Sequence, residues 1–264
     1  MARIVTTFAR NEDFEEAFAG LGALGLSHEV IDPGRAYSMV SAGAIVMEEE
    51  VRGMLAAAGY HLKNASGWVR EMRKPGRVPA DEAPVYREDI FGRAAVMILA
   101  SCSADETRIR TIAHISGNMG PALPYLNAEM PYASYNAAGQ SLTYMQGYRL
   151  ITLYKQRIAL AKADHIVDAW RVLESIRRSI NDTWARRAEI EPSYMVRRRP
   201  DAIEIYSRLP HINCGECGFP TCLAFAMRVH GGYVPLTLCR PVFAGDHASL
   251  RDALLEVGAG IVGA

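Results

Sequence analysis

Four of the five cysteines in this 264-residue chain lie close together, between positions 214 and 239. Cys214, Cys217, Cys222 and Cys239 follow the spacing C-x2-C-x4-C-x16-C. Four thiolates are the ligand set of a [4Fe-4S] cluster, with one cysteine per iron. The same number of thiolates can hold a structural zinc ion, but zinc sites usually pair two Cys-x-x-Cys knuckles and only one is present. The spacing therefore indicates a metal centre and favours the cluster over zinc.

The residues around these cysteines suit anionic ligands. Gly215 and Gly218 allow tight turns and a close approach of backbone N–H groups to inorganic sulfides. Residues 223–230 read as a helix, which would place Cys222 near a helix N-terminus, a favourable position for a thiolate. Pro241 follows the fourth cysteine closely.

The segment Asn213-Cys-Gly-Glu-Cys-Gly-Phe-Pro-Thr-Cys222-Leu-Ala-Phe-Ala226, with Cys239 downstream, closely resembles a known four-cysteine iron–sulfur domain. That domain occurs in the large subunit of the corrinoid iron–sulfur protein of acetyl-CoA synthesis and in the B subunit of the Rnf electron-transport complex. The resemblance covers residues 205–243 and implies that all four cysteines ligate one low-potential [4Fe-4S] cluster.

This sequence departs from both families outside that domain. In the corrinoid protein the domain leads a barrel domain, whereas here it stands last. The Rnf subunit has a membrane anchor and further ferredoxin-type cysteine repeats, and this sequence has neither. The resemblance therefore carries over the cluster domain but not the activity of either protein.

Other residues could take part in redox chemistry, and each also has a structural interpretation. Cys102 follows a predicted buried strand and could be a redox thiol, although an inert buried cysteine is the stronger interpretation. His211 and His230 flank the cysteine segment and could tune the cluster by hydrogen bonding, or simply be packed or exposed. A basic run could dock an acidic partner or be a solvated linker: Arg197, Arg198 and Arg199.

Residues 116–140 form a stretch rich in Gly, Pro, Asn and Tyr with no clear period. Long irregular segments in compact domains are often functional. Five side chains could line a pocket for a flat polar ligand or form a docking surface: Tyr125, Asn127, Glu129, Tyr132 and Asn136. The alternative is a packed loop whose tyrosines cover neighbouring strands.

Composition gives no further indication of a partner. Lys plus Arg equals Asp plus Glu, at 29 each, so no nucleic acid or acidic surface is favoured. The longest apolar runs, such as 94–100, are too short for a membrane span. No signal peptide precedes the strand-like residues at the N-terminus, so we expect a cytoplasmic protein.

The pattern of elements predicts an α+β fold with an antiparallel meander covered by a long helix. We expect strands at 3–8, 28–31, 44–47 and 94–100, and helices at 11–24 with Asn11 as cap and at 48–58. Ser103 and Glu106 form a capping-box pattern that predicts a helix over 104–115. The predicted meander strands are 141–145, 149–154 and 157–161.

Asp164 should be the N-cap of the long helix, which should bury one apolar face: Ile166, Trp170, Leu173, Ile176, Ile180 and Trp184. We divide the chain into a small α/β unit at 1–60, a linker or surface excursion at 61–92, an α+β domain at 93–190, a [4Fe-4S] domain at 200–245, and a C-terminal helix and tail at 246–264.

Three functional hypotheses follow. The first is an electron-transfer or accessory protein of anaerobic metabolism that serves a protein redox partner, which could be a larger metalloenzyme or a corrinoid protein. The second is an enzyme or cofactor-handling protein with a pocket at 116–140, and the third is a redox or oxygen sensor. The sequence has no P-loop, dinucleotide fingerprint, nucleophile elbow or radical-enzyme cysteine triad, so no specific catalytic reaction is indicated.

Overall fold

The computed structural model describes residues 2–60, 62, 64–71, 73–103, 105–130, 132–196 and 200–258, without the side chains of 67, 68 and 256–258. Contacts between Cα atoms divide the chain into two units, each built from two stretches. The first unit holds residues 1–121 and 155–186, and the second holds 122–154 and 187–264. The predicted domain boundaries themselves stay predictions.

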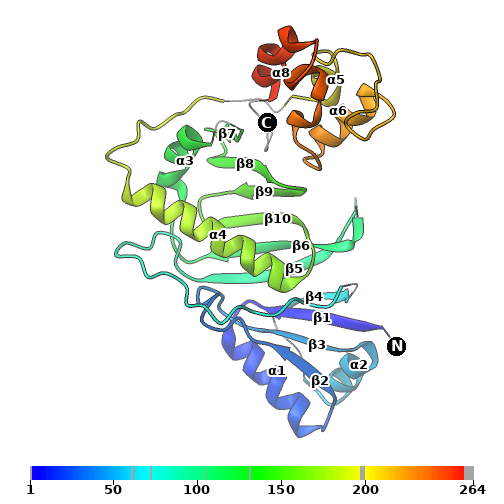
Figure 1. Ribbon diagram of the computed structural model, residues 1–264. Coiled ribbons are helices and arrows are strands. Elements are labelled where there is room, and N and C mark those ends of the chain that lie inside the picture. The colour runs from blue at the N-terminus through cyan, green and yellow to red at the C-terminus, as the bar shows by residue number, and fades with distance from the viewer. Residues whose placement is uncertain are drawn as a thin grey trace. The chain divides into compact units, whose positions relative to one another are not determined.

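A four-stranded antiparallel sheet opens the first unit, in the order β2-β3-β1-β4 (Figure 1). The strands are β1 (Arg3–Phe8), β2 (His28–Ile31), β3 (Ala44–Glu48) and β4 (Ala65–Arg70). Helices α1 (Asn11–Ala23) and α2 (Glu49–Ala57) follow β1 and β3. The expected strands and helices of residues 1–60 are thus confirmed. Helix α1, however, has Arg10 rather than Asn11 at its N-cap, with no side-chain cap bond.

One face of this sheet packs against both helices, because alternate strand residues point to the same side. Ile4 and Phe8 of β1 share a buried cluster with Leu21 of α1 and Leu55 of α2. The opposite face meets the next strand of the unit. There the hydroxyl oxygen of Thr7 accepts a hydrogen bond of 3.1 Å from the buried backbone N–H of Ile98.

A second sheet has six strands in the order β5-β6-β10-β9-β8-β7. In the first unit these are β5 (Ala94–Cys102), β6 (Asp105–Ile115) and β10 (Arg157–Ala163). In the second unit β7 (Ser134–Asn136), β8 (Ser141–Gln146) and β9 (Arg149–Leu153) pair antiparallel in chain order. The predicted meander is therefore confirmed as β8, β9 and β10, with Gly147 at a positive φ in the first turn.

The helix predicted over 104–115 is wrong, because this stretch forms strand β6. Residue 104 lies outside the described residues. From Ile109 to Ile115 the buried positions fall on every second residue, which is the period of a strand. These buried positions include three β-branched residues, Ile109, Thr111 and Ile115, which fit a pleated surface. That period outweighs the local capping signal of Ser103 and Glu106.

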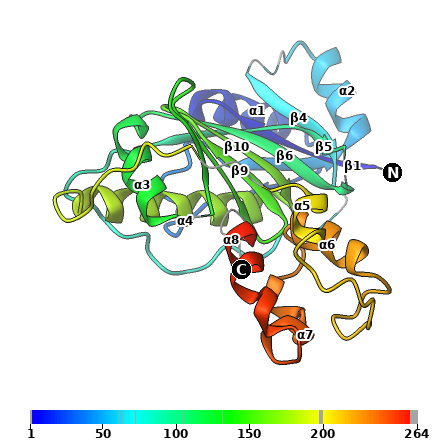
Figure 2. The ribbon, with the colours of Figure 1, turned by 90° about the horizontal axis from the view of Figure 1, so that it is seen from above.

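Helix α4 (Ile166–Ala185) packs against β10, a strand of the same unit (Figures 1 and 2). Its predicted apolar face is buried from Ile166 to Ile180, and Trp184 is partly exposed. The cap prediction is wrong by one residue. His165 caps the helix by accepting a hydrogen bond from the Asp168 N–H, whereas Asp164 pairs with Arg108 at 3.0 Å.

The segment 61–92 is less irregular than expected, since residues 65–70 form β4. The rest is held against α4 by a polar network. Arg177, almost fully buried, pairs with Glu174 at 2.9 Å and Asp89 at 3.1 Å and donates to the carbonyl of Pro84 at 2.7 Å. Asn181 accepts from the N–H of Ile90 at 3.0 Å.

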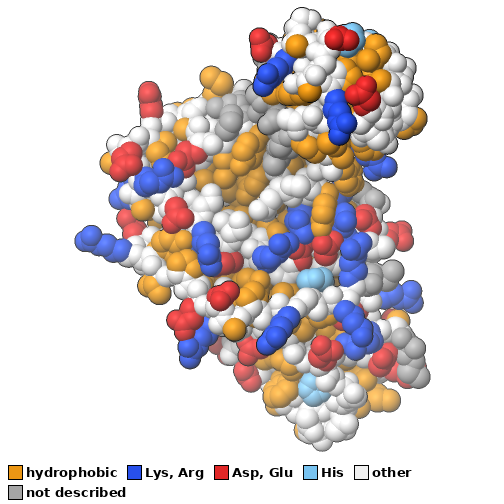
Figure 3. Space-filling view, in the orientation of Figure 1, with side chains coloured by type: hydrophobic (Ala, Val, Ile, Leu, Met, Phe, Trp, Pro, Cys, Tyr) orange, Lys and Arg blue, Asp and Glu red, His pale blue; other side chains and the backbone are white. Residues whose placement is uncertain are grey.

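The α+β fold class is confirmed, with helices packed on antiparallel sheets. On the face shown in Figure 3, basic and acidic side chains are interspersed, as the balanced composition predicts. None of the helices within the described residues is long and apolar enough to cross a bilayer.

Candidate metal centre

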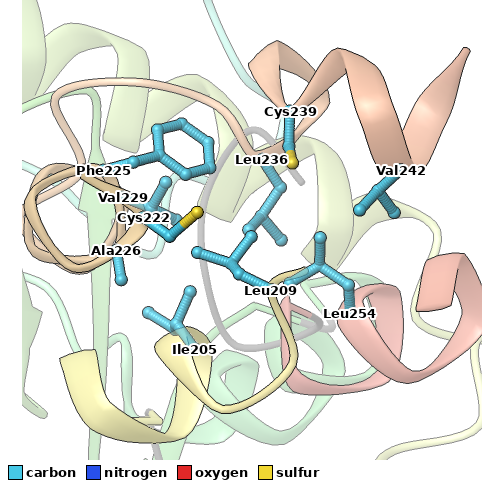
Figure 4. Packing of buried hydrophobic residues seen from close by; sticks show 10 residues of the cluster. All are labelled: Ile205, Leu209, Cys222, Phe225, Ala226, Val229, Leu236, Cys239, Val242 and Leu254. Carbon is cyan, nitrogen blue, oxygen red and sulfur yellow. The ribbon is translucent and has the colours of Figure 1, made fainter. Parts of the chain in front are cut away.

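The last described part of the second unit is a small helical module with its own core. Its elements are α5 (Ala202–Tyr206), α6 (Cys222–His230), η2 (Leu236–Leu238), α7 (Arg240–Phe243), η3 (Ala248–Leu250) and α8 (Arg251–Gly258). Figure 4 shows the core cluster: Ile205, Leu209, Cys222, Phe225, Ala226, Val229, Leu236, Cys239, Val242 and Leu254. Helix α5 begins with a capping box between Asp201 and Glu204.

The four cysteines differ in exposure. Cys222 and Cys239 are members of the buried core, at 8% and 6% exposed, whereas Cys217 is half-buried and Cys214 is exposed. In Figure 4 the sulfur atoms of Cys222, on α6, and Cys239, just before α7, point into the space between these two segments. A group held by all four would therefore have one side in the core and another at the surface.

The loop that carries the first three cysteines has an unusual backbone. His211, Asn213, Gly215 and Gly218 all have positive φ values, of 58°, 48°, 75° and 83°. Glycine adopts this region without strain, and asparagine tolerates it better than most residues. A Cβ atom added to Gly218 would meet nothing within 4 Å, so backbone conformation rather than space requires glycine there.

Two side-chain contacts fix the ends of this loop. The side-chain oxygen of Asn213 accepts a hydrogen bond of 2.8 Å from the backbone N–H of Cys222. The hydroxyl of Thr221 caps α6 by accepting from the N–H of Ala224 at 3.0 Å. Helix α6 therefore begins at Cys222, as predicted, and places this thiol at a positive helix end. The sequence pattern alone assigned no role to Asn213, although an asparagine beside a cysteine in a glycine-rich loop is a usable signal.

The pKa of the Cys239 thiol responds to its burial and to the other three cysteines of the segment. Burial raises the pKa of Cys239 to about 11, and the charges of the Cys222, Cys217 and Cys214 thiolates act in the same direction. A hydrogen bond from the Val242 N–H opposes the shift. Crowded thiols of this kind favour a bound metal, because coordination replaces the protons and neutralises the mutual repulsion.

Within the described part of the chain, no three His, Cys, Asp or Glu side chains form a group that could hold a metal ion. In a [4Fe-4S] cube each thiolate binds its own iron, so four sulfurs need not meet at one point. The donor set fits such a cube in its chemistry, because one module supplies four thiols, positive-φ turns and a helix N-terminus.

The two flanking histidines contact backbone carbonyls. His211 stacks on Tyr206, with ring centroids 4.3 Å apart, and its Nε2 donates to the Tyr206 carbonyl at 2.7 Å. His230 donates from Nδ1 to the carbonyl of Pro200 at 3.1 Å. A role in tuning the cluster stays a prediction for both. The basic run Arg197, Arg198 and Arg199 lies outside the described residues.

Cys102 is buried and lies at the end of β5, paired with Asp105 of β6. Cys102 therefore lies in a β-hairpin, and not between a strand and a helix as the predicted helix over 104–115 implied. Its position in the first unit is separate from the cysteine module, which belongs to the second. The inert interpretation fits this burial.

The segment 116–140 is more regular than expected, with a 3-10 turn at Gly120–Ala122, helix α3 (Leu123–Glu129) and β7. Asn127 is fully buried and donates to the carbonyls of Ser193 at 2.8 Å and Met195 at 3.0 Å. Tyr132 packs edge-on against Tyr144. Asn136 accepts from the N–H of Gly139 at 2.9 Å. These contacts are those of a packed loop. A ligand pocket that also includes Tyr125 and Glu129 stays a prediction.

Comparison with known proteins supports an iron–sulfur protein. Residues 209–241 match a family model described as "Putative Fe-S cluster". The chain is 60% identical over 52 residues to the corrinoid/iron-sulfur protein large subunit of Moorella thermoacetica, covering 20% of this chain and 11% of that protein. It is 45% identical over 40 residues to the acetyl-CoA decarbonylase/synthase complex subunit gamma of Archaeoglobus fulgidus, covering 15% and 8% respectively.

These matches confirm the resemblance to the corrinoid iron–sulfur protein of acetyl-CoA synthesis, whereas the resemblance to the Rnf subunit stays a prediction. They reach only about a tenth of the length of these relatives, and most of this chain lies outside them. No solved structure matches the chain. What is shared is therefore the cysteine module, and the two sheets carry no likeness that assigns an activity.

Proposed function

We propose that Cys214, Cys217, Cys222 and Cys239 together ligate one [4Fe-4S] cluster and that the chain is an electron-transfer or accessory protein. The observation that carries this proposal is the placement of the four thiols, two in the module core and two toward the surface. A cluster of this kind supplies reversible one-electron transfer when bound.

The residues of the module have separate tasks in this proposal. Cys222 and Cys239 fix the inner side of the site within a packed core. Gly215 and Gly218 turn the backbone so that N–H groups can face the sulfides, and Asn213 holds the loop against α6. The low polarity around Cys239 would lower the reduction potential, because burial disfavours added negative charge.

The exposed side of the site supports exchange of electrons with another protein. Cys214 is exposed and Cys217 half-buried, so a partner can approach this edge without unfolding the module. Both curated relatives are named as subunits, one of a corrinoid/iron-sulfur protein and one of an acetyl-CoA decarbonylase/synthase complex. We infer by analogy that the partner is a corrinoid protein or a larger metalloenzyme. We also keep the expected cytoplasmic location as part of the proposal.

Metal analysis tests the ligand claim directly. Protein purified without oxygen should contain about four iron and four sulfide per chain. It should show a broad absorption that bleaches on reduction, and a one-electron reduced state visible by paramagnetic resonance. Stoichiometric zinc without iron would sink the proposal.

A redox titration tests the carrier role. The cluster should take up one electron reversibly, and the spectra should contain no second chromophore. A bound organic cofactor, or substrate turnover by the isolated chain, would instead favour an enzyme. Candidate partners encoded beside this gene should accept electrons from the reduced protein, and transfer should vanish in a variant that lacks the cluster.

A further inference from the structure

A groove in the first unit lies far in sequence from the cysteine module. Its lining residues come from α1, from β2 and the turn after it, and from the loop that enters β3, elements whose backbone is drawn in Figure 1. Its volume is about 400 Å³, within the range of small-molecule sites in proteins. Gly43 lies at its base, where a Cβ atom would come within 2.9 Å of the Ile31 carbonyl and 3.3 Å of the Phe14 ring. The groove thus depends on a close backbone approach.

One wall of the groove is a single face of α1. Asn11, Phe14, Glu15 and Phe18 line it at spacings of three and four, so they share that face. The rings of Phe14 and Phe18 are parallel, with centroids 6.3 Å apart, and Phe18 also meets His28 edge-on. Phe18 remains 44% exposed. Aromatic rings that stay in contact with water on one side leave room for another apolar body.

Strand β2 and the turn after it also contribute apolar side chains to the groove. Val30 of β2, 38% exposed, lines the groove together with Pro33. Phe18 and Val30 both line the groove and both keep part of their apolar surface exposed. A flat or branched hydrocarbon group could pack there between Phe18 and Val30.

The lining of the groove also includes a cation and polar side chains. Arg93 is exposed and donates to the carbonyl of Val40 at 3.2 Å, beside the bridge between Val40 and Ala94. Among the described residues, it forms no ion pair. Ser41 and Asn11 also line the groove. A guanidinium with free donors next to a hydroxyl and an amide is a good partner for a carboxylate.

Two acidic side chains face the groove as well. Glu15 and Asp32 are exposed, and neither forms an ion pair with another described residue. One oxygen of Asp32 accepts from the Gly34 N–H at 2.7 Å, which orients the carboxylate and leaves its second oxygen for a ligand. The groove therefore offers one cation, two anions and an apolar surface.

We propose that this groove binds a small zwitterion of the amino-acid type with an apolar side chain. The carboxylate of the ligand pairs with Arg93, and its ammonium group pairs with Asp32 and Glu15. Its side chain packs against Phe18 and Val30. This binding function is independent of the cluster, so it should persist in a Cys214→Ser variant.

Three related probes test the charge pattern on the full chain: L-phenylalanine, 3-phenylpropionate and 2-phenylethylamine. They share the aromatic ring and differ in which charges they carry. Binding measured by calorimetry, with the Gly43 amide as an NMR reporter, should be at least about tenfold tighter for L-phenylalanine than for either analogue, since each lost charge-assisted bond is worth about 1.5 kcal/mol or more. Equal affinity for all three, or no binding at about 10 mM, would overturn the proposal.

Single substitutions test the proposed roles of Arg93 and Phe18 in binding. Arg93→Met should weaken L-phenylalanine binding by about tenfold or more, and Arg93→Lys should restore part of it because the positive charge is kept. Phe18→Ala truncates an exposed side chain, so it should weaken binding without unfolding the unit. The control is Arg87→Met, which removes an exposed arginine that does not line the groove. Binding unaffected by Arg93→Met or Phe18→Ala, or equally affected by Arg87→Met, would show that the assignment is wrong.

Discussion

The side-chain oxygen of Asn213 accepts a hydrogen bond of 2.8 Å from the backbone N–H of Cys222. This contact joins the residue before the first cysteine to the third cysteine, across the whole ligand loop. Asn213 itself has a φ of 48°, in the left-handed region. One residue therefore supplies both a backbone turn and a clamp that sets the distance between two proposed ligands.

Substitution at Asn213 can separate these two roles. Asn213→Gly keeps the positive φ and removes the clamp, so we expect a loss of about 1 kcal/mol in module stability. Asn213→Ala loses the clamp and also strains the backbone, which should add about 1 kcal/mol. The measurement is the rate at which iron is released to a chelator in the absence of oxygen. This rate should be slowest for the wild type, faster for Asn213→Gly and fastest for Asn213→Ala.

The control for this series is Asn118→Gly. Asn118 makes a local turn contact to the N–H of Gly120 in the first unit, far from the cysteines in sequence. Its substitution should leave iron release unchanged. Faster release from the Gly variant than from the Ala variant would contradict the proposed backbone role of Asn213.

Gly218 and Gly22 should respond oppositely to the same change. Gly218 has a φ of 83°, so Gly218→Ala should destabilise the module by about 1–2 kcal/mol and lower cluster occupancy. Gly22 lies inside α1, where an added Cβ atom would meet nothing within 4 Å. Gly22→Ala should therefore stabilise the protein by about 0.5–1 kcal/mol. Chemical denaturation and iron content report the two effects, and a stabilising Gly218→Ala would refute the conformational argument.

Cys214 and Cys102 form a matched pair for the ligand assignment. Cys214→Ser should remove or degrade the cluster, because one iron loses its thiolate. Cys102→Ser should keep full iron and sulfide content, since Cys102 lies in the hairpin of the first unit. Iron and sulfide are measured on protein prepared without oxygen. Iron loss from the Cys102 variant would show that the ligand set is wrong.

Asp89 should make the first unit sensitive to acid. Burial raises its pKa, but hydrogen bonds from the N–H groups of Gly92 and Phe91, from Asn181 and from Arg177 together lower it below its usual range. A depressed carboxyl pKa contributes stability above the unfolded value near 4, and that stability is lost as pH falls through the folded value.

Asp89→Asn should therefore lower the unfolding free energy at neutral pH by about 1–3 kcal/mol. The difference from wild type should shrink as pH falls below about 4, because Asp89 of the unfolded chain takes up a proton first, and it should be lost at the lower folded pKa. Thermal or urea unfolding across this pH range measures the effect. Asp81→Asn, which changes an exposed carboxylate, should show no such pH dependence.

Long periodic segments were predictable from the sequence. The face of α4 follows from apolar residues at spacings of three and four, and β8 and β9 follow from short alternating runs joined at Gly147. The start of α6 at Cys222 was also predictable, because Thr221 is a good N-cap residue. The cysteine spacing identified the candidate site itself.

The misses have a common cause in tertiary packing. Over 105–115 the capping pattern of Ser103 and Glu106 is a weak local signal, and pairing with β5 and β10 outweighs it. Strand β4 follows a polar, interrupted stretch, and only its pairing with β1 makes it a strand. The sequence signal of Asn213 beside Cys214 indicates a turn, but the partner of the clamp lies nine positions away and depends on the folded loop.

Cys222 and Cys239 belong at once to the hydrophobic core and to the proposed ligand set. A module of this design contains both its folding information and its cofactor site in one short run of sequence. A segment of this kind suits transfer between unrelated proteins by gene fusion, and the two relatives share only a small fraction of their length with this chain. The two sheets of this chain would then belong to the recipient protein, and the cysteine module would be an acquired electron-transfer domain.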